Sequence, residues 1–384
     1  MNGRLGFVGG AAPAVLRVGL WFAAAGMAGD AVAARFCVAD AEGLTAALAA
    51  AAGNGEDNEI LLRQGVYFAP AGGWRIDLLD GAHSLDLAGG HADAACSRRS
   101  ADAALTVLDG NDLARPLSIE TSGSFGAPNG KHINVSGLTF RNGRAEDAAG
   151  LKVSDPGPIY GGTILVEGNV FLDNTTTSFR FGLGAGALLA ATDGPNFNGG
   201  TGLVVRNNLF AGNSGPDAAA MYLFSNNLIE VGNNTVADNR ATDAALGERV
   251  AVGYFTLTGI RFSNNVFWDN NPAALPQTYD LRLDDNGQAR AALVNNLLQS
   301  RVGTAVSETG SVGGNPVFAD AAARNYAPGA GSPLVDAGSG TSTAGLPPLD
   351  VAGRPRVAGT QVDIGAYERD ATQPDAVFAD GFDG

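Results

Sequence analysis

The sequence predicts an all-β protein that folds as a single-stranded right-handed parallel β-helix with a short N-terminal capping helix. Three observations favour this fold. Asn-Asn or Gly-Asn pairs, each followed by apolar residues, recur through much of the chain. Hydrophobic residues make up 45% of the sequence and charged residues only 16%, too few for helix bundles or coiled coils. The 55 glycines show no three-residue period, which excludes collagen and suits many tight turns.

The spacing of the repeats allows room for loops. The last apolar residues of the repeats are separated by 31, 39, 26, 31 and 31 residues, and they are Phe140, Phe171, Phe210, Val236, Phe267 and Leu298. A coil of three short strands and three turns needs about 22 residues. We expect the additional residues to form loops on one side of the solenoid, where repeat proteins usually bind ligands.

The recurring Asn has a physical explanation in this fold. Sharp turns need left-handed backbone conformations, which are cheap only for Gly, Asn and Asp. Coils stacked about 4.8 Å apart bring equivalent Asn side chains into contact, so that their amides can hydrogen-bond along the stack. We therefore expect a structural row of Asn169, Asn208, Asn234, Asn265 and Asn296. A β-propeller, a β-sandwich or a leucine-rich repeat would not keep such a row.

Residues 1–34 have the pattern of a secretory signal peptide. Arg4 and Arg17 are followed by an apolar stretch at 18–29 and by Ala31-Val32-Ala33, a small-x-small cleavage pattern. An N-terminal membrane anchor is the alternative, although the apolar stretch is short for a membrane span. No second apolar run of about 20 residues follows. We expect a secreted or cell-surface protein whose mature chain has no membrane span.

The first part of the mature chain, 35–70, is predicted to cap the solenoid. Asp40 is a suitable N-cap for a helix that Gly53 ends. Such a helix would cover the hydrophobic core exposed at the first coil. Export permits disulfides, and Cys37 and Cys96 are the two cysteines. We expect one disulfide; the alternative, a metal pair, lacks partner ligands at suitable spacing.

Several segments resemble a known group of proteins. Residues 89–91, Cys96 and residues 106–111 resemble the early coils of secreted bacterial β-helix proteins of the choice-of-anchor Q type, within the pectin-lyase-like superfold. Segments near the C-terminus look like the closing part of that family: 315–318, 332–338, 350–356 and 362–368. The resemblance covers about 36–369 and implies the fold and an extracytoplasmic location. It implies no activity, because enzymes of the wider superfold are an analogy of fold alone.

The resulting domain plan has three parts. A β-helix at 35–369 follows the signal peptide and includes a closing segment at 314–369. Residues 370–384 form a flexible acidic tail with the run Asp380-Gly381-Phe382. This tail resembles a short Asp-Gly-Phe end found on many exported proteobacterial proteins. It is either a sorting or attachment tag or a disordered end.

Charge limits the classes of partner. The formal net charge of −15 repels phosphate backbones, so we expect no nucleic-acid partner. The three histidines show no metal-ligand spacing, and we expect no metal site. No cofactor is expected, except Ca²⁺ if the protein is a polysaccharide lyase. We also expect a monomer.

Catalytic candidates are few. Residues 279–285 place Asp280, Arg282 and Asp284 on one face of a strand if side chains alternate, with Leu281 and Leu283 pointing inward. Such a carboxylate-Arg-carboxylate face is either a site for acid-base chemistry or a solvated strand with internal ion pairs. Ligand-binding candidates are Tyr222 and Tyr254, which could stack on sugar rings or pack in the core.

Two functional hypotheses follow from the sequence. The favoured one is a secreted or surface protein that binds glycans or other cell-envelope material, because no acid-base constellation is complete. The alternative is a polysaccharide lyase or glycoside hydrolase acting on an acidic polysaccharide. Whether the protein is an enzyme stays open at this level.

Overall fold

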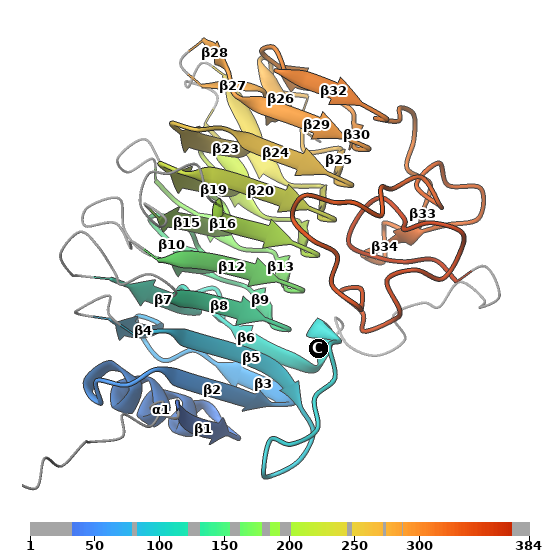
Figure 1. Cartoon of the computed structure of the whole chain (residues 1–384). Helices are drawn as coiled ribbons and strands as arrows, with labels where there is room; N and C mark the ends of the chain where they lie inside the picture. Colours follow the sequence, from blue (N-terminus) through green and yellow to red (C-terminus); the bar gives the residue numbers. More distant parts are fainter. Residues whose placement is uncertain are drawn as a thin grey trace, which may run out of the picture. The chain divides into compact units, whose positions relative to one another are not determined.

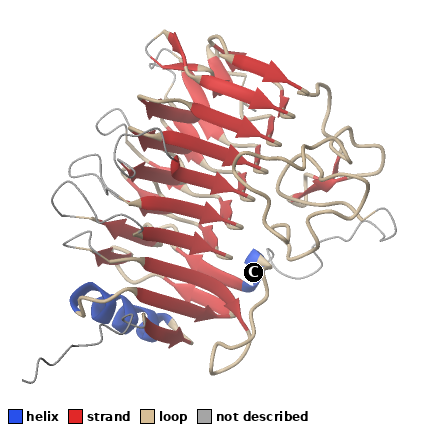
Figure 2. Ribbon diagram, viewed as in Figure 1, coloured by secondary structure: helices blue, strands red, loops and turns tan. Residues whose placement is uncertain are grey.

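The chain coils into a parallel β-helix in which successive coils stack on one another (Figure 1). The structure is a computed structural model and describes residues 33–78, 83–121, 131–153, 162–178, 185–192, 201–243, 248–271, 274–285 and 287–370. Within these ranges helix is confined to α1 (Ala41–Gly53) and the short 3-10 turn η1 (Ala103–Leu105), and strands dominate (Figure 2). The predicted all-β parallel β-helix is confirmed. The predicted signal peptide (1–34) and tail (370–384) lie almost entirely outside the described residues.

Strands of successive coils pair in parallel and, within the described ranges, form three long sheets and a short one. Sheet I consists of β1 (Ala34–Val38), β2 (Asn58–Arg63), β5 (Leu85–His91), β8 (His132–Ser136), β12 (Thr163–Glu167), β16 (Thr201–Arg206), β20 (Leu228–Gly232), β24 (Ile260–Ser263), β29 (Ala291–Val294) and β32 (Ser307–Thr309). Sheet II consists of β3 (Gly65–Phe68), β6 (Thr106–Asp109), β9 (Thr139–Arg141), β13 (Val170–Leu172), β17 (Leu209–Ala211), β21 (Thr235–Ala237), β25 (Val266–Trp268) and β30 (Leu297–Leu298).

The other sheets complete each coil. Sheet III consists of β4 (Trp74–Asp77), β7 (Leu117–Glu120), β11 (Leu151–Val153), β15 (Leu188–Thr192), β19 (Ala218–Ser225), β23 (Arg249–Thr256), β26 (Thr278–Arg282) and β31 (Arg301–Val302). Sheet IV, the short one, consists of β10 (Arg144–Ala145), β14 (Thr175–Thr176), β18 (Ser214–Gly215) and β22 (Arg240–Ala241). Two antiparallel pairs lie outside these sheets: β27 (Asp284–Asp285) with β28 (Gln288–Ala289), and β33 (Phe318–Asp320) with β34 (Asn325–Pro328).

One coil shows the course of the chain. From β12 in sheet I, the pair Gly168-Asn169 turns the chain into β13 of sheet II. Asp173-Asn174 then turns it into β14 of sheet IV, and the chain continues through β15 of sheet III to β16, the next strand of sheet I. Both turns around sheet II are two residues long. The first residue of each has a positive φ, 63° at Gly168 and 52° at Asp173, as expected where only Gly, Asn and Asp are cheap.

Stacked apolar side chains fill the interior. Phe140, Phe171 and Phe210 occupy equivalent positions on sheet II, and their ring centroids are 5.1 and 4.5 Å apart. Val236 and Phe267 continue the row in the same core cluster. Such offset stacking adds about 0.5–1.5 kcal/mol per aromatic pair beyond the burial of area. The recurring Phe and Val of the repeats thus form a row inside the core.

The five Asn residues of the predicted structural row lie in register, and their side chains are fully buried. The side-chain Nδ2 of each of the first four donates to the Oδ1 of the Asn in the next coil. These four distances are 3.2, 2.9, 3.0 and 3.0 Å, in order from Asn169 up to Asn296. The same Nδ2 also donates to a carbonyl of the preceding coil, as Asn265 does to Val231 at 2.9 Å. These bonds satisfy amides that would otherwise be costly to bury.

A second buried row lies at the turn between sheets II and IV, and the sequence analysis did not predict it as a row. It links Asn174, Asn213, Asn239 and Asn270 through Nδ2-to-Oδ1 bonds of 2.9, 2.9 and 2.8 Å. The two rows lie at the turns before and after each strand of sheet II. Each coil is thus held to the next by side-chain amides as well as by strand pairing.

Residues 314–369 cover the outer face of sheet II (Figure 1). Val170, Leu172 and Leu209 point outward from that sheet and pack against Tyr326 and Tyr367 of this segment. Apolar residues on both faces explain why the strands of sheet II read as continuous hydrophobic runs. Residues 314–369, called the closing segment below, therefore lie along the side of the coils.

Asn side chains also hold the closing segment. At the turns between sheets I and II, the first Asn of the Asn-Asn pair has a positive φ, such as 57° at Asn264, and its side chain points outward. Asn264 donates to the Ser339 carbonyl at 2.9 Å and accepts from the Ser339 N–H at 2.7 Å. Asn207 and Asn295 donate to the carbonyls of Leu349 and Ala337 at 3.1 and 2.8 Å. We call this series the outer Asn column: Asn207, Asn233, Asn264 and Asn295.

The N-terminal end is capped as predicted, with one difference. Asp40 accepts from the Gly43 N–H at 2.8 Å and starts α1, whose buried face joins the core. The difference is β1, a strand that precedes the helix and that the sequence analysis did not predict. The predicted disulfide between Cys37 and Cys96 is confirmed, and it ties β1 to the loop after β5. The strand β1 is short, and the disulfide and its pairing with β2 hold it against the first coil.

Candidate functional site

The outer face of sheet III is one of the faces that the closing segment does not cover. The closing segment covers sheet II, and the described residues place no comparable layer over sheet III. Several of the longer connections begin or end at strands of sheet III: 121–131, 154–162 and 193–200 lead from it to sheet I, and 177–187 and 242–248 lead into it from sheet IV. Residues 92–105 form another long connection, from sheet I to sheet II, so the expected restriction of loops to one side is met only in part.

Three aromatic side chains lie on that face. Tyr222, Phe224 and Phe255 are partly exposed and alternate with core residues such as Leu223. Phe224 and Phe255 are neighbours in adjacent strands and stack with centroids 4.9 Å apart and planes 11° apart. Tyr222 lies over Gly253, because a Cβ added to that glycine would come within 2.9 Å of its ring. We call these three residues the aromatic face.

Charged groups surround Tyr222. Arg282 lies 3.7 Å from Glu248 and, with Asp217 and Asp285, acts electrostatically on Tyr222. Burial, reinforced by the two aspartates, raises the pKa of the Tyr222 hydroxyl to about 12. The phenol therefore stays protonated and can serve as a hydrogen-bond donor at any physiological pH.

Asp217 is the acid with the most unusual surroundings on this face. Its Oδ1 is buried and has no hydrogen-bond partner among the described residues. Burial raises the pKa of its carboxyl, and the nearby Arg282 and Arg249 oppose that rise. A carboxyl with a raised pKa beside a cation and a phenol is an arrangement found at many functional sites.

Asp280 does not share this face, and the outward orientation predicted for it is wrong. The side chain is 1% exposed. Its Oδ1 accepts from Asn270 Nδ2 at 2.7 Å, which ends the second Asn row, and its Oδ2 accepts from the Ser300 N–H at 2.7 Å. Strict alternation fails here because Asp280 and Leu281 are consecutive and both buried. The donors around the carboxylate offset much of the cost of burying it.

The other members of the predicted carboxylate-Arg-carboxylate face are only partly buried. Arg282 does point outward, while Leu281 and Leu283 lie in the core as expected. Asp284 belongs to the antiparallel pair of β27 and β28 and approaches Gly303. The structure therefore brings Arg282 near Glu248, Asp217 and Asp285, and separates it from Asp280.

Tyr254 takes the second of its two alternatives and packs in the core. It is 3% exposed and lies in the core, with its ring centroid 6.3 Å from that of Phe262. The register explains this placement: Tyr254 pairs with Leu223, and Tyr222 pairs with Gly253. Because residues paired across parallel strands share a face, Tyr254 points inward and its neighbour Phe255 points outward.

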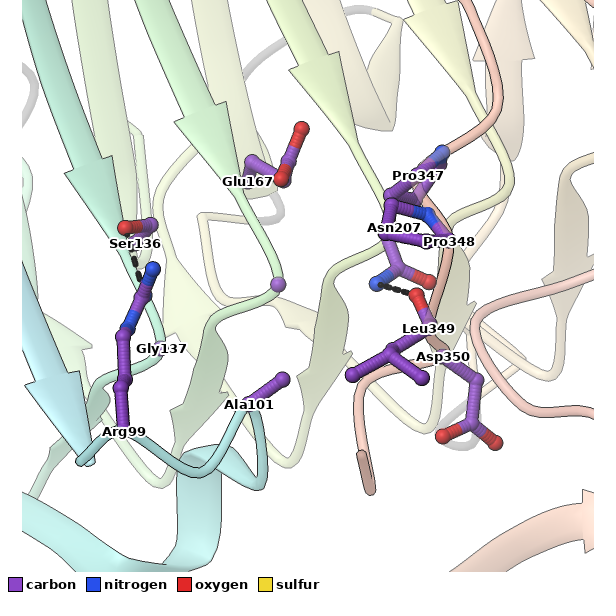
Figure 3. A pocket seen from close by; sticks show the side chains of 11 residues that line it. Arg99, Ala101, Ser136, Gly137, Glu167, Asn207, Pro347, Pro348, Leu349 and Asp350 are labelled. Carbon is purple, nitrogen blue, oxygen red and sulfur yellow. Dashed lines mark hydrogen bonds between the residues drawn. The ribbon is translucent and has the colours of Figure 1, made fainter. Parts of the chain in front are cut away.

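A separate cavity of 250 Å³ lies where the closing segment meets the turns between sheets I and II. Arg99 and Ser136 lie on one side of it, and Asn207, Pro347 and Pro348 lie on the other (Figure 3). Gly137 and Gly168 also line it. They are the first turn residues of two earlier coils, at the position where later coils have an Asn of the outer Asn column. We call this cavity the turn pocket.

Two opposite charges line the turn pocket without bonding to each other. Arg99 donates from Nε to the Gly89 carbonyl at 3.0 Å and from a terminal nitrogen to Ser136 Oγ at 2.8 Å. Glu167 pairs with Arg206. Burial lowers the pKa of the Arg99 guanidinium and the carboxylate of Glu167 raises it, so Arg99 stays charged as arginines do.

Sequence analysis missed Phe224, Phe255 and Asp217, and all members of the turn pocket. The pair Phe224 and Phe255 could have been found by aligning the strands at 218–225 and 249–256, because both precede a Ser or Thr. No local signal marks Arg99 or Glu167, since their common cavity depends on residues 347–350. No group of three or more His, Cys, Asp or Glu that could hold a metal ion occurs in the described part of the chain.

Comparison with known proteins adds no relative. A scan against models of protein families found no match to this chain. A search of curated proteins found none that is similar.

Proposed function

We propose that the protein is an exported β-helix protein of the choice-of-anchor Q type that binds glycans or other envelope material through the aromatic face. The observation that carries this proposal is the group of Tyr222, Phe224 and Phe255, partly exposed on the sheet that several of the longer connections border. Aromatic rings present flat apolar area with little loss of conformational entropy, which suits the C–H faces of sugar rings.

The charged groups beside the aromatic face would orient a ligand. The Tyr222 hydroxyl, the guanidinium of Arg282 and the carboxylate of Asp285 lie at one end of it. A few polar groups next to an apolar surface are the usual composition of a small-ligand site. Sugar hydroxyls can both donate to a carboxylate and accept from a guanidinium.

Export belongs to the same proposal. The disulfide between Cys37 and Cys96 fits an oxidising compartment. In the described residues, no helix is both long enough and apolar enough to cross a membrane. We propose a secreted or surface location after removal of the N-terminal signal peptide, and a monomer as the working form.

Glycan binding can be tested with the mature protein on an array of neutral and acidic glycans, followed by titration calorimetry on the best ligand. Replacing both Phe224 and Phe255 by Ala should weaken binding at least about tenfold, at roughly 1–3 kcal/mol per stacked ring. Phe68→Ala is the matched control, because Phe68 is 58% exposed on sheet II, away from the aromatic face. Equal binding by the double variant and the control would reject the proposed site.

A second candidate function, cleavage of an acidic polysaccharide, has one observation in its favour. Asp217 combines a raised pKa with positions near Arg282 and Tyr222, and general acids of this kind occur in polysaccharide hydrolysis. Incubation with acidic polysaccharides, with and without Ca²⁺, would release reducing ends or unsaturated products. Asp217→Asn should abolish that release, while Asp320→Asn, an exposed site in the closing segment, should not.

A further inference from the structure

The turn pocket exists because two turns lack the side chain that their equivalents carry. Asn207 bonds the closing segment directly, whereas Gly137 and Gly168 leave space in the two preceding coils. Arg99 occupies part of that space: a Cβ on Gly137 would lie 2.8 Å from its terminal nitrogen. Glycine at 137 suits the φ of 67°, which Asn adopts in later coils, and it leaves room for the approach of Arg99.

Hydrogen bonds and an ion pair hold the side chains of Arg99 and Glu167 in place in the turn pocket. Arg99 is fixed by Gly89 and Ser136, which leaves further N–H groups of its guanidinium without a hydrogen bond to the described residues. Glu167 is held through its Oε2 by Arg206, whose own NH1 donates to the Ala344 carbonyl at 2.6 Å. The Oε1 of Glu167 has no bond to the described residues and is available as an acceptor.

Arg99 is the group of the turn pocket that suits an anion, because the two acids that line it have other partners. Arg206 neutralises Glu167 directly. The carboxylate of Asp350 accepts from the backbone N–H groups of Ala352, Arg354 and Glu368, so its hydrogen bonds are made within the closing segment. Among the groups that line the turn pocket, Arg99 thus offers cationic N–H groups that no carboxylate of the described residues bonds, and planar guanidinium groups bind carboxylates in a bidentate manner.

Apolar groups of the turn pocket lie beside Asn207, on the side away from Arg99 (Figure 3). Pro347, Pro348 and Leu349 come from the closing segment, and Ala101 comes from the loop that carries Arg99 (Figure 3). Proline rings present C–H surface that can pack against a saturated ring. The volume of 250 Å³ lies below the range of about 300–1,000 Å³ typical of sites for drug-sized ligands.

We propose that the turn pocket binds a hydroxylated carboxylate of the size of one sugar residue. Its carboxylate bonds the free edge of Arg99, a hydroxyl donates to Glu167, and its ring packs against Pro347, Pro348 and Leu349. This site is distinct from the aromatic face, since it lies at the turns between sheets I and II. It does not depend on the proposed glycan binding.

The test uses the mature protein and D-glucuronate, observed by ligand NMR and titration calorimetry. D-Glucose supplies hydroxyls without a carboxylate, and acetate supplies a carboxylate without a ring. We expect glucuronate to bind at least about tenfold more tightly than either, because one charge-assisted hydrogen bond is worth roughly that factor. Equal binding of glucose and glucuronate would overturn the role assigned to Arg99.

Variants locate the ligand. Arg99→Gln should weaken glucuronate binding at least about tenfold. Ala101→Leu should also weaken it, by filling the cavity without changing a charge. Arg98→Gln is the matched control, because Arg98 is an exposed neighbour that pairs with Asp93 and does not line the turn pocket.

The outcomes separate this inference from the proposed function. Binding of glucuronate that persists in both Arg99→Gln and Ala101→Leu would overturn the turn pocket as its site, even if the ligand binds elsewhere. Absence of glucuronate binding in a protein that still binds glycans on the array would overturn this inference alone. Loss of array binding in the Phe224 and Phe255 double variant, with glucuronate binding retained, would support both.

Discussion

Asn264 and Asn265 are adjacent and identical in sequence but have opposite roles in the structure. Asn264 has a φ of 57°, points outward and bonds Ser339 of the closing segment. Asn265 points inward and bonds the neighbouring Asn of its row above and below. The comparison teaches that one dipeptide both builds the coil and attaches the segment that covers it. The inner row should contribute more stability. Its side chains are fully buried, so water cannot replace a bond that they lose in the folded protein.

Breaking the inner row should have the largest effect. Asn265→Val keeps the approximate size of the side chain but removes its bonds to Val231 and Asn296 and leaves Asn234 without its acceptor. We expect the free energy of unfolding to fall by about 4 kcal/mol, since several buried polar groups lose partners. Chemical denaturation measures this change. A loss below that of Asn264→Gly would contradict the ranking of the two positions.

A pH dependence should distinguish the closing segment from the inner row. Burial, with help from Asp363, raises the pKa of Glu368 in that segment from 4.5 to about 7, against the opposing effect of Arg356. The folded protein therefore retains a proton that the unfolded chain has already released. Stability from this group is complete below pH 4.5 and is lost as the pH rises through about 7, by roughly 3 kcal/mol for a side chain that is 1% exposed.

The variant Glu368→Gln isolates that dependence. We expect its free energy of unfolding to vary less than that of the wild type between pH 4.5 and 7. His91, whose pKa is lowered mainly by burial, titrates in the same region with the opposite sign, and it cancels in the difference between the two proteins. Parallel pH curves for the variant and the wild type would show that Glu368 is charged in the fold at neutral pH.

The end of the second Asn row offers a smaller test. Asp280→Asn keeps an oxygen for Asn270 but sets an amide N–H group against the N–H of Ser300. We expect a loss of roughly 1–2 kcal/mol in the free energy of unfolding. Asp284→Asn, at a partly exposed position, should change it by no more than about 0.5 kcal/mol. Equal effects of the two substitutions would argue that Asp280 does not anchor the row.

The smallest effect is expected at the outer Asn column. Asn264→Gly tolerates the positive φ but removes the two bonds to Ser339. We expect a loss of about 1 kcal/mol, together with faster hydrogen exchange of the Ser339 amide. Hydrogen exchange followed by mass spectrometry measures the local effect. Unchanged exchange at Ser339 would mean that other contacts of the closing segment suffice to hold it.

Local and periodic features were predictable because their partners recur at a known spacing. The Asn row from Asn169 to Asn296 and the helix beginning after Asp40 follow from turn chemistry and capping. Asp280 was predicted on the wrong face, and the choice between core and surface stayed open for Tyr254. In both cases a shift of one residue along the strand decides between core and surface. The period of the repeat did not show which residues of the sheet III strands face the core, because the number of residues before these strands varies from coil to coil.

The sequence by itself determined the coil, its inner Asn row and its capping helix, since each depends on residues close together or repeated in register. Only the tertiary structure decided what the surface became. Asn264 meets a partner 75 residues later in the chain, and the turn pocket joins Arg99 to Pro347. Such contacts depend on where the closing segment lies, which no local propensity encodes. The same dependence on packing decides which face of sheet III carries Tyr222 and Phe255.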